Sequence, residues 1–268
     1  MAKSSKQVVL ITGGAMGQGR THAVAFAKAG FDVVLIDMLE PENEIFKETI
    51  ALVRDAGGEV LALQANICST PEVEAAFAQA WEKFGRLDVV VANAGIINFG
   101  YTWELSDEQV ERALAVNLEG TWRTDKYAAI YMRKQGYGRI INISSVSGLK
   151  GTAQLATYCM TKFGIIGLTK TLALELQSEG LPIYCNFVCP TKVRTPMCET
   201  ESYVDFVNST MGKSFTSWQE MFEDEKNPGG LKFLNPEDVT DMVLWLAESE
   251  AATKFNGREI VVDRGAML

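Results

Sequence analysis

The sequence predicts a single-domain α/β protein of residues 1–268, with a doubly wound parallel sheet of seven strands and helices on both faces. Short runs rich in Val and Ile alternate along the chain with longer segments of helical period, which is the order of strand–helix–strand units. The runs are apolar throughout, as expected for strands that are buried on both faces of a parallel sheet. A chain of 268 residues, 47% of them apolar, is long enough for one large core.

The predicted strands and helices follow one another in chain order. The strands are the apolar runs at 8–11, 33–36, 60–63, 89–92, 140–143, 183–188 and 260–262. The helices are the segments of helical period at 17–29, 42–56, 71–84, 106–134, 155–178 and 236–248. Several helix starts carry capping residues, namely Thr70 before Pro71, Ser106 before a pair of acids, and Asn235 before Pro236.

Residues 195–233 lack a clear period but keep large apolar side chains. Such side chains need a surface against which to pack. We interpret this segment as a helical insertion that forms a lid over the functional site. Packing within the lid or a subunit contact is the alternative role for its large side chains. The residues that we expect to line the site are Ile96, Ile97, Phe99, Val146, Leu149 and the Met and aromatic residues of 197–222, which are Met197, Tyr203, Phe206, Met211, Phe215, Trp218, Met221 and Phe222.

The composition excludes several function classes. The formal net charge is −9 and the chain has no basic run, so nucleic acid is not an expected partner. The first apolar run is too short for a signal peptide or a membrane span, which predicts a cytoplasmic protein without a membrane partner. The five cysteines are odd in number and form no C-x-x-C pair, which indicates reduced thiols and predicts no metal site.

A glycine-rich turn follows the first predicted strand. It contains Gly13, Gly17 and Gly19, with Met16 and Gln18 between them, and the next helix begins near Gly17. Backbone N–H groups at the amino end of a helix attract anions, and glycine lets a ligand approach the backbone closely. The turn therefore predicts a dinucleotide pyrophosphate site of the Rossmann type. The alternative is a glycine turn that serves packing alone.

The second predicted strand ends in Asp37. An acid at this place accepts hydrogen bonds from the adenosine ribose hydroxyls and repels a 2′-phosphate. Met38, Leu39 and Glu40 follow it, so no Lys or Arg is close in sequence to receive such a phosphate. The sequence therefore predicts NAD rather than NADP, against the alternative that Asp37 is a solvated charge at a strand end.

Tyr158 and Lys162 stand four residues apart in a predicted helix, with Ser145 upstream. Side chains at i and i+4 of a helix share one face, so the Lys162 ammonium can lie beside the Tyr158 phenol. A nearby cation favours the ionised phenol and lowers its pKa from the ordinary value of about 10. The pair predicts an acid/base group that works near neutral pH, although each residue by itself also fits a purely structural role.

Five motifs in a fixed order give the chain a resemblance to the short-chain dehydrogenase/reductase family along nearly its whole length. They are the glycine turn at 12–19, Asn93-Ala94-Gly95, Asn117 on a helix, Ser145 after a strand, and Tyr158 with Lys162. The strings at 17–23 and 190–197 are similar to a subgroup typified by carveol dehydrogenases, whose related enzymes act on cyclic terpenoid or steroid-like secondary alcohols. Departures from the commonest pattern are Asn66, where Asp is usual, and Thr191, where Gly usually follows the proline.

The resemblance implies a mechanism. Tyr158 would exchange a proton with the substrate oxygen while hydride passes between the carbinol carbon and the nicotinamide of NAD(H). Ser145 would hold that oxygen, Lys162 would lower the Tyr158 pKa and bind the nicotinamide ribose, and Asn117 would hold a water on a proton route. Beyond the glycine turn and Asp37, the implied cofactor contacts are Asn66, Ile67, Asn93, Ala94, Gly95, Tyr158, Lys162, Pro190, Thr191, Val193 and Thr195.

The resemblance also implies a homotetramer, formed through the helices at 106–134 and 155–178, and a small apolar alcohol or ketone as substrate. A catalytically silent, nicotinamide-sensing regulatory protein of the same fold is the alternative. A serine hydrolase is excluded, because His22 is the only histidine and the chain has no G-x-S-x-G elbow around Ser145.

Overall fold

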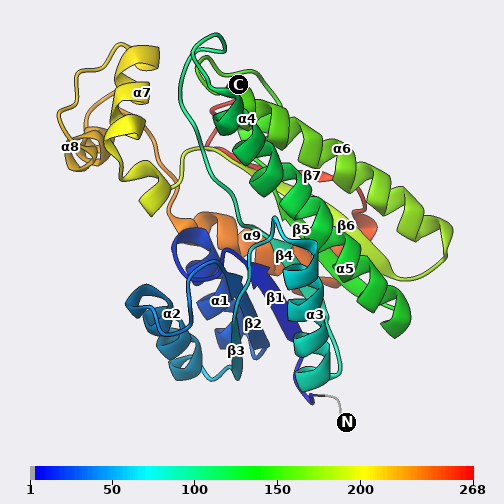
Figure 1. The fold of residues 1–268 in the computed structure, drawn as a ribbon. Coiled ribbons are helices and arrows are strands. Elements are labelled where there is room, and N and C mark those ends of the chain that lie inside the picture. Colours follow the sequence, from blue (N-terminus) through cyan, green and yellow to red (C-terminus); the bar gives the residue numbers. More distant parts are fainter. Residues whose placement is uncertain (1–3) are drawn as a thin grey trace.

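The computed structural model describes residues 4–268, which form one sheet of seven parallel strands (Figure 1). The strands are β1 Val8–Thr12, β2 Asp32–Asp37, β3 Val60–Gln64, β4 Val89–Ala92, β5 Gly138–Ile143, β6 Ile183–Pro190 and β7 Glu259–Val262. Their order in the sheet is β3-β2-β1-β4-β5-β6-β7, and every neighbouring pair is parallel. The predicted doubly wound sheet is confirmed.

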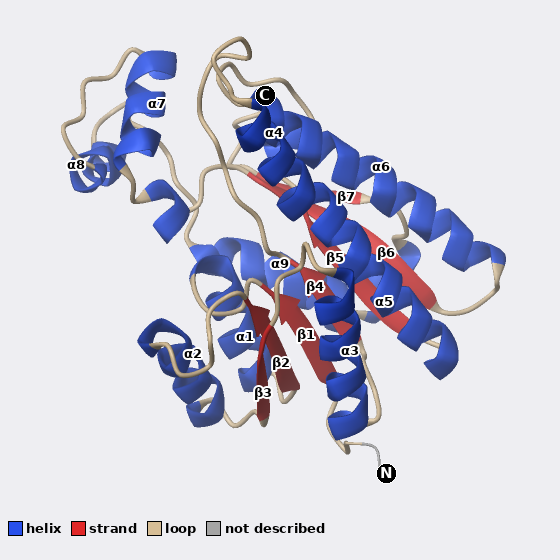
Figure 2. Ribbon diagram, viewed as in Figure 1, coloured by secondary structure: helices blue, strands red, loops and turns tan. Residues whose placement is uncertain are grey.

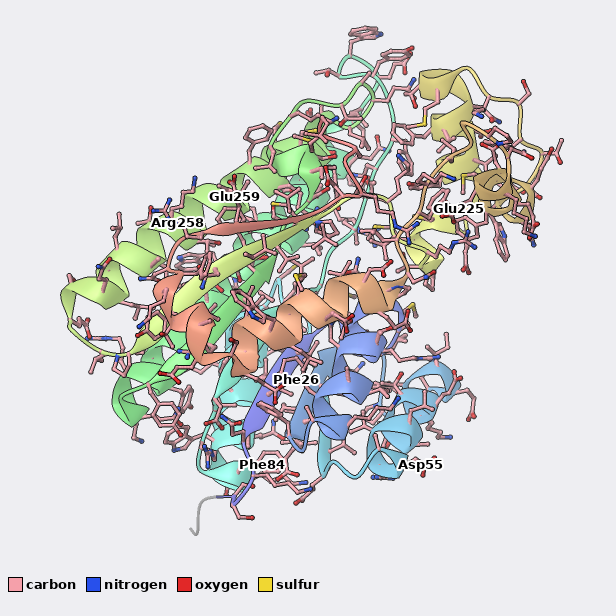
Figure 3. The ribbon with its side chains drawn as sticks, turned by 180° about the vertical axis from the view of Figure 1, so that it is seen from behind. Phe26, Asp55, Phe84, Glu225, Arg258 and Glu259 are labelled. Carbon is pink, nitrogen blue, oxygen red and sulfur yellow. The ribbon has the colours of Figure 1, made fainter. Side chains whose placement is uncertain are left out.

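Helices cover both faces of this sheet. Figures 1 and 3 show the molecule from opposite sides, and Figure 2 shows the helices in blue and the strands in red. They are α1 Gly17–Lys28, α2 Glu44–Asp55, α3 Thr70–Phe84, α4 Asp107–Ala113, α5 Gly120–Gln135, α6 Ala156–Ser178, α7 Glu201–Met211, α8 Trp218–Glu223 and α9 Pro236–Glu248. One core lies between the sheet and α1, α2 and α9, and includes Phe26 and Phe46. The other lies beneath α3, α5 and α6, and includes Phe77 and Met132.

The predicted helix at 106–134 is not one regular helix. It begins at a capping box between Ser106 and Gln109, but α4 and α5 are joined by a π-helical stretch, Leu114–Glu119. At the start of α5, a Cβ on Gly120 would lie 2.6 Å from the Cδ1 of Ile67, so only glycine lets the helix pass the loop after β3 this closely. Wide turns of this kind often occur at functional sites, and this one contains Asn117.

Residues of α7 and α8 form a small layer of their own, beyond the end of the sheet (Figure 1). Its core is a cluster of aromatic and aliphatic side chains that includes Tyr203, Phe206, Met221, Phe222 and Phe233. Residues 195–233 therefore contain helices, as expected, and these helices enclose a third, smaller apolar cluster. None of the helices within residues 4–268 combines the length and apolar character that a membrane span requires.

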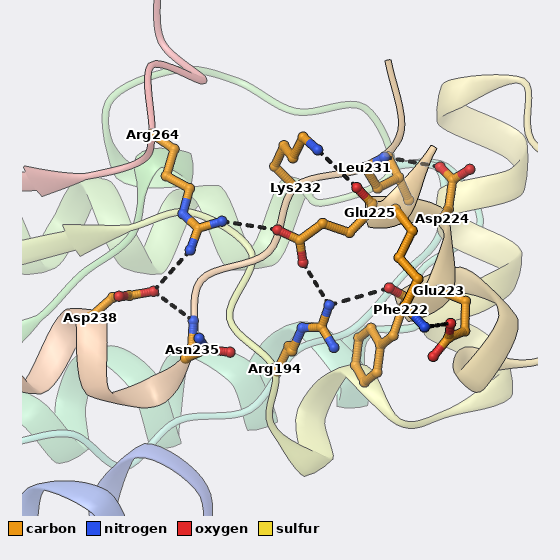
Figure 4. Close-up of polar contacts among 11 residues, drawn as sticks. Arg194, Phe222, Glu223, Asp224, Glu225, Leu231, Lys232, Asn235, Asp238 and Arg264 are labelled. Atoms are coloured by element: carbon orange, nitrogen blue, oxygen red, sulfur yellow. Dashed lines mark hydrogen bonds and ion pairs between the residues drawn. The ribbon is translucent and has the colours of Figure 1, made fainter. Parts of the chain in front are cut away.

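Ion pairs tie the end of this layer to the rest of the fold (Figure 4). Arg194, in the loop after β6, donates to Glu225 at 2.6 Å and to the Phe222 carbonyl at 3.2 Å. Arg264 donates to the other Glu225 oxygen at 2.9 Å and to Asp238 of α9 at 3.4 Å. Hydrogen bonding by Arg194 is the main reason why the pKa of Glu225 lies below its ordinary value. Glu225 thus connects the layer to two separate parts of the chain.

A carboxyl group is buried beneath α5. Asp125 is 1% exposed, and its Oδ2 accepts a 2.8 Å hydrogen bond from the Asn142 amide of β5. The same amide donates to Thr169 Oγ1 of α6 at 2.8 Å, while Asp125 Oδ1 has no hydrogen-bond partner within residues 4–268. Burial raises the pKa of Asp125 to about 7, and the Asn142 hydrogen bond opposes that rise.

This carboxyl group predicts a pH dependence of stability. The folded chain keeps the Asp125 proton up to about pH 7, whereas the unfolded chain loses it near pH 4. The folded state binds more protons in that window, so the free energy of unfolding should fall, by about 4 kcal/mol, as the pH rises through it. Urea titrations of Asp125→Asn should show most of this slope removed, while the exposed control Asp241→Asn should keep it. An equal slope in both variants would contradict the assignment.

Candidate active site

A cavity of about 1190 Å³ opens at the carboxyl ends of the strands. The β1–α1 turn, the ends of β2 to β6, and residues of α6 and α7 line it. Ligands of open α/β sheets bind at this edge, where the strand order reverses, which here is between β1 and β4. The cavity brings together all of the catalytic and cofactor residues predicted from the sequence except Gly19 and Asn117.

The β1–α1 turn has the shape that a pyrophosphate site needs. Gly13 and Gly17 have positive φ angles of 65° and 57°, and the first N–H groups of α1 have no partner inside the helix. Gln18 lines the cavity, and its buried Oε1 has no hydrogen-bond partner within residues 4–268. Gly19 lies behind the turn, where a Cβ would stand 2.0 Å from the Gly13 oxygen. The turn therefore fits a dinucleotide, and Gly19 is needed for the turn to close rather than for ligand contact.

Asp37 is fixed in place at the end of β2. Its Oδ2 accepts the Ala15 N–H at 3.0 Å, and its Oδ1 accepts the Leu39 N–H at 3.2 Å. A carboxylate has about four lone-pair positions, so both oxygens can still accept ribose hydroxyls. The bond to Ala15 was not predicted from the sequence, and it ties the acid to the glycine turn.

Thr12 and Asn93 join the ends of β1 and β4. Thr12 Oγ1 accepts the N–H groups of Asn93 and Ala94 at 3.1 and 3.2 Å. The Asn93 amide donates in return to the carbonyls of Thr12 and Gly13 at 3.0 and 3.2 Å. Asn93 therefore shapes the glycine turn as well as lining the cavity.

Ser145, Tyr158 and Lys162 meet in this cavity from the loop after β5 and from α6. Lys162 is 4% exposed, and its Nζ donates to the Ile143 carbonyl at 2.7 Å. The same Nζ lies 5.4 Å from the centre of the Tyr158 ring, one helical turn away. Ser145 Oγ lies 3.4 Å from the Pro190 carbonyl, to which it donates. The structure thus places the three predicted catalytic side chains together.

Burial dominates the electrostatics of Tyr158 and Lys162. It raises the pKa of the Tyr158 phenol above its ordinary value, although a hydrogen bond with Ser145 opposes the rise. It lowers the pKa of the Lys162 ammonium to about 8. The direction for Tyr158 is opposite to the one expected from the sequence, because the loss of hydration of a buried phenolate outweighs the hydrogen bond with Ser145. An ionised Tyr158 would need hydrogen bonds and positive charge close to its oxygen; Ser145 supplies such a hydrogen bond, and Lys162 is the nearby cation.

Asn117 is fully buried and does not line the cavity. Its Oδ1 accepts the Ile96 N–H at 2.8 Å, and its amide donates to the Ile96 carbonyl at 2.9 Å and to Thr161 Oγ1 at 3.2 Å. The side chain therefore fixes the loop after β4 against α6. These partners were not predicted from the sequence, since an isolated asparagine on a helix does not reveal which loop it contacts.

Comparison with known proteins agrees with this geometry. The family model described as short chain dehydrogenase matches residues 7–203. The chain belongs to the short-chain dehydrogenase family. An uncharacterized NAD-dependent oxidoreductase of Mycobacterium tuberculosis is 37% identical over 272 residues, which cover 97% of this chain and 96% of the relative. The (−)-trans-carveol dehydrogenase of Rhodococcus erythropolis is 32% identical over 280 residues, which cover all of both chains.

The fold of this short-chain dehydrogenase is similar to that of carveol dehydrogenase from Mycobacterium avium, solved in complex with NAD. The TM-score is 0.87 at 28% identity, over 100% of this chain and 99% of that one. The family, the carveol dehydrogenase-like type and the class of oxidoreductases that act on CH–OH donors are therefore confirmed. NAD is named for two of the three relatives, in agreement with the cofactor predicted from Asp37.

The apolar wall of the dehydrogenase cavity agrees with the sequence prediction only in part. The expected residues that do line it are Ile96, Ile97, Phe99, Val146, Met197, Tyr203, Phe206 and Met211. Those that do not are Leu149, Phe215, Trp218, Met221 and Phe222, the last four of which pack within the cluster under α7 and α8. A segment without a period does not show which side chains face a cavity. Lining residues that the sequence did not predict include Lys150, Leu155, Lys192 and Cys198.

Proposed function

We propose that this dehydrogenase transfers hydride between NAD(H) and a secondary alcohol or ketone on a small, largely apolar, cyclic substrate. The meeting of Ser145, Tyr158 and Lys162 with a dinucleotide turn in one cavity is the observation that supports it most directly. The apolar wall of the cavity and the carveol dehydrogenases among the relatives support the cyclic substrate. Residues 195–233 serve as the substrate lid.

In this proposal NAD(H), when bound, supplies or accepts the hydride. Tyr158 exchanges the proton with the substrate oxygen, and Ser145 donates a hydrogen bond to the same oxygen and orients it. Lys162, held by the Ile143 carbonyl, places positive charge beside Tyr158 and has ammonium protons left for the nicotinamide ribose. Asn117 keeps the loop after β4 in place and holds a water on the proton route.

The remaining predicted cofactor residues hold the nucleotide in this proposal. Asp37 accepts the adenosine ribose hydroxyls, Asn66 meets the adenine, and the glycine turn binds the pyrophosphate. The side chains and backbone that line the same part of the cavity are Gly13, Met16, Gly17, Gln18, Ile67, Asn93, Ala94, Gly95, Pro190, Thr191, Val193 and Thr195. A silent, nicotinamide-sensing protein is less well supported, because Tyr158 and Lys162 are both present and adjacent.

Replacement of Tyr158 by Phe tests the proton transfer. Since a positioned acid/base group contributes about 100- to 10 000-fold, kcat for reduction of a cyclic ketone should fall by at least about 100-fold. NADH binding, followed by fluorescence, should stay near that of the wild type. Tyr184→Phe, at the opposite end of β6, is the matched control. Wild-type turnover in Tyr158→Phe would refute the assignment, and steady turnover by the wild type would exclude the silent regulator.

Replacement of Asp37 by Asn tests the cofactor preference. The amide oxygen can still accept the Ala15 N–H, so the turn keeps its shape while the negative charge is removed. We expect the ratio of kcat/KM for NADPH to that for NADH to rise about ten-fold, which corresponds to about 1.4 kcal/mol. Asp55→Asn, at the end of α2, is the control. An unchanged ratio would show that Asp37 does not discriminate between the two cofactors.

We also propose a homotetramer that packs through α5 and α6. Trp122 and Ile130 of α5 and Met160, Phe163 and Leu174 of α6 are large apolar residues that the single chain leaves exposed. Sedimentation velocity should show a tetramer at micromolar concentration. Phe163→Glu with Leu174→Glu should shift it to smaller species.

Leu52→Glu, on α2, is the control for the assembly test because Leu52 is similarly exposed but lies away from α5 and α6. This variant should remain tetrameric. A wild-type protein that sediments only as a monomer would refute the proposal.

A further inference from the structure

Two lysines that the proposed catalytic roles do not use line the cavity, Lys150 and Lys192. Within residues 4–268, the charged side chains that line it are Asp37, Lys150, Lys162 and Lys192. Asp37 belongs to the adenosine side of the proposed nucleotide site, and Lys162 serves Tyr158. Lys150 and Lys192 have no role in the proposed reaction, and no further acid lines the cavity near them. A substrate group must therefore be considered as their partner.

The backbone of Lys192 is fixed, but its side chain is not paired. Its carbonyl accepts the Leu234 N–H at 2.8 Å, and the Thr191 N–H donates to the Val262 carbonyl at 3.0 Å. The residue is partly buried, yet across residues 4–268 its ammonium makes neither an ion pair nor a hydrogen bond. Burial of an ammonium group costs free energy when the group loses its hydration and gains no ion-pair or hydrogen-bond partner. A site of this kind therefore favours the binding of an anion.

Arg194 provides an internal contrast, two residues along the same loop. It is paired with Glu225 at 2.6 Å and with the Phe222 carbonyl at 3.2 Å (Figure 4). Within residues 4–268 the fold therefore supplies an acid for Arg194, whose side chain points to α8, and none for Lys192, which lines the cavity. This difference separates a structural cation from one that is available to a ligand.

Lys150 approaches the same region from the neighbouring loop. Strands β5 and β6 are adjacent, and the loops after them carry Lys150 and Lys192. Lys150 Nζ donates one hydrogen bond to the Ala266 carbonyl at 3.1 Å, which leaves ammonium protons for a ligand. Both lysines line the same cavity, and burial, followed by the charge of Lys150, lowers the pKa of Lys192. An anion between them would favour their charged forms.

We propose that Lys192, together with Lys150, binds a carboxylate of the substrate, so that the enzyme acts on hydroxy acids and keto acids with an apolar ring. This inference rests on the proposed hydride transfer. Tyr158 and Ser145 form hydrogen bonds with the oxygen that reacts, and the apolar wall packs against the ring. The two lysines bind the carboxylate at the β5–β6 side of the cavity. Lys192 is then a specificity-determining residue that touches substrate but not the reacting carbon.

The first test compares matched substrates on the wild-type enzyme. Positional isomers of oxocyclohexanecarboxylate are offered with NADH, each beside its methyl ester, which keeps the ring and the ketone but has no charge. We expect at least one acid to have a kcat/KM about ten-fold above that of its ester, chiefly through a lower KM. Turnover of esters with no preference for any acid would overturn the inference but leave the proposed function intact. Absence of turnover with every ketone, including neutral cyclic ones, would instead refute the proposed function.

The second test removes the charge. Lys192→Met keeps the length of the side chain, and we expect it to lower the acid-over-ester preference about ten-fold, whereas Lys192→Arg should retain most of it. Lys150→Met should lower it to a smaller extent, since Lys150 is already bonded to Ala266. The exposed Lys254→Met is the control and should keep the wild-type preference. An equal loss for acid and ester, or a loss of NADH affinity in Lys192→Met that accounts for the whole effect, would overturn the proposal.

Discussion

The hydrogen bond between Lys162 and the Ile143 carbonyl is the interaction on which the active site depends. At 2.7 Å it ties α6 to the last residue of β5, and Tyr158 is positioned because it lies one turn before Lys162 on the same helix. Without this bond an ammonium that is 4% exposed would be buried with no partner. The Lys162 ammonium is thus held in place by the edge of the sheet itself.

Burial sets the chemistry of this pair more strongly than proximity does. The phenol and the ammonium both shift toward their neutral forms, because each charged form loses its hydration inside the cavity. A site of this kind has a low local dielectric, so any charge or hydrogen bond that faces the Tyr158 oxygen acts on it strongly. Ser145 forms such a hydrogen bond with the phenol.

Charge is distributed unevenly along the cavity. Asp37 stands at the β2 side, where it is bonded to the glycine turn, while Lys150 and Lys192 stand at the β5–β6 side. The cavity therefore has an acid at one side and two lysines at the other. Such a distribution of charge orients a charged ligand before any single contact forms. In the proposed function it places the nucleotide and the substrate at different ends.

The sequence by itself determined the sheet, its helices and the site residues that belong to local motifs. Apolar runs such as 89–92 fix strands, and Tyr158 with Lys162 fixes a shared helical face, because these patterns depend only on near neighbours. Tertiary structure alone decided the rest. Asn117 is bonded to Ile96, Trp218 packs in the cluster under α7 and α8 instead of lining the cavity, and Lys192 has no acidic partner within residues 4–268. Each of these depends on which distant segments pack together.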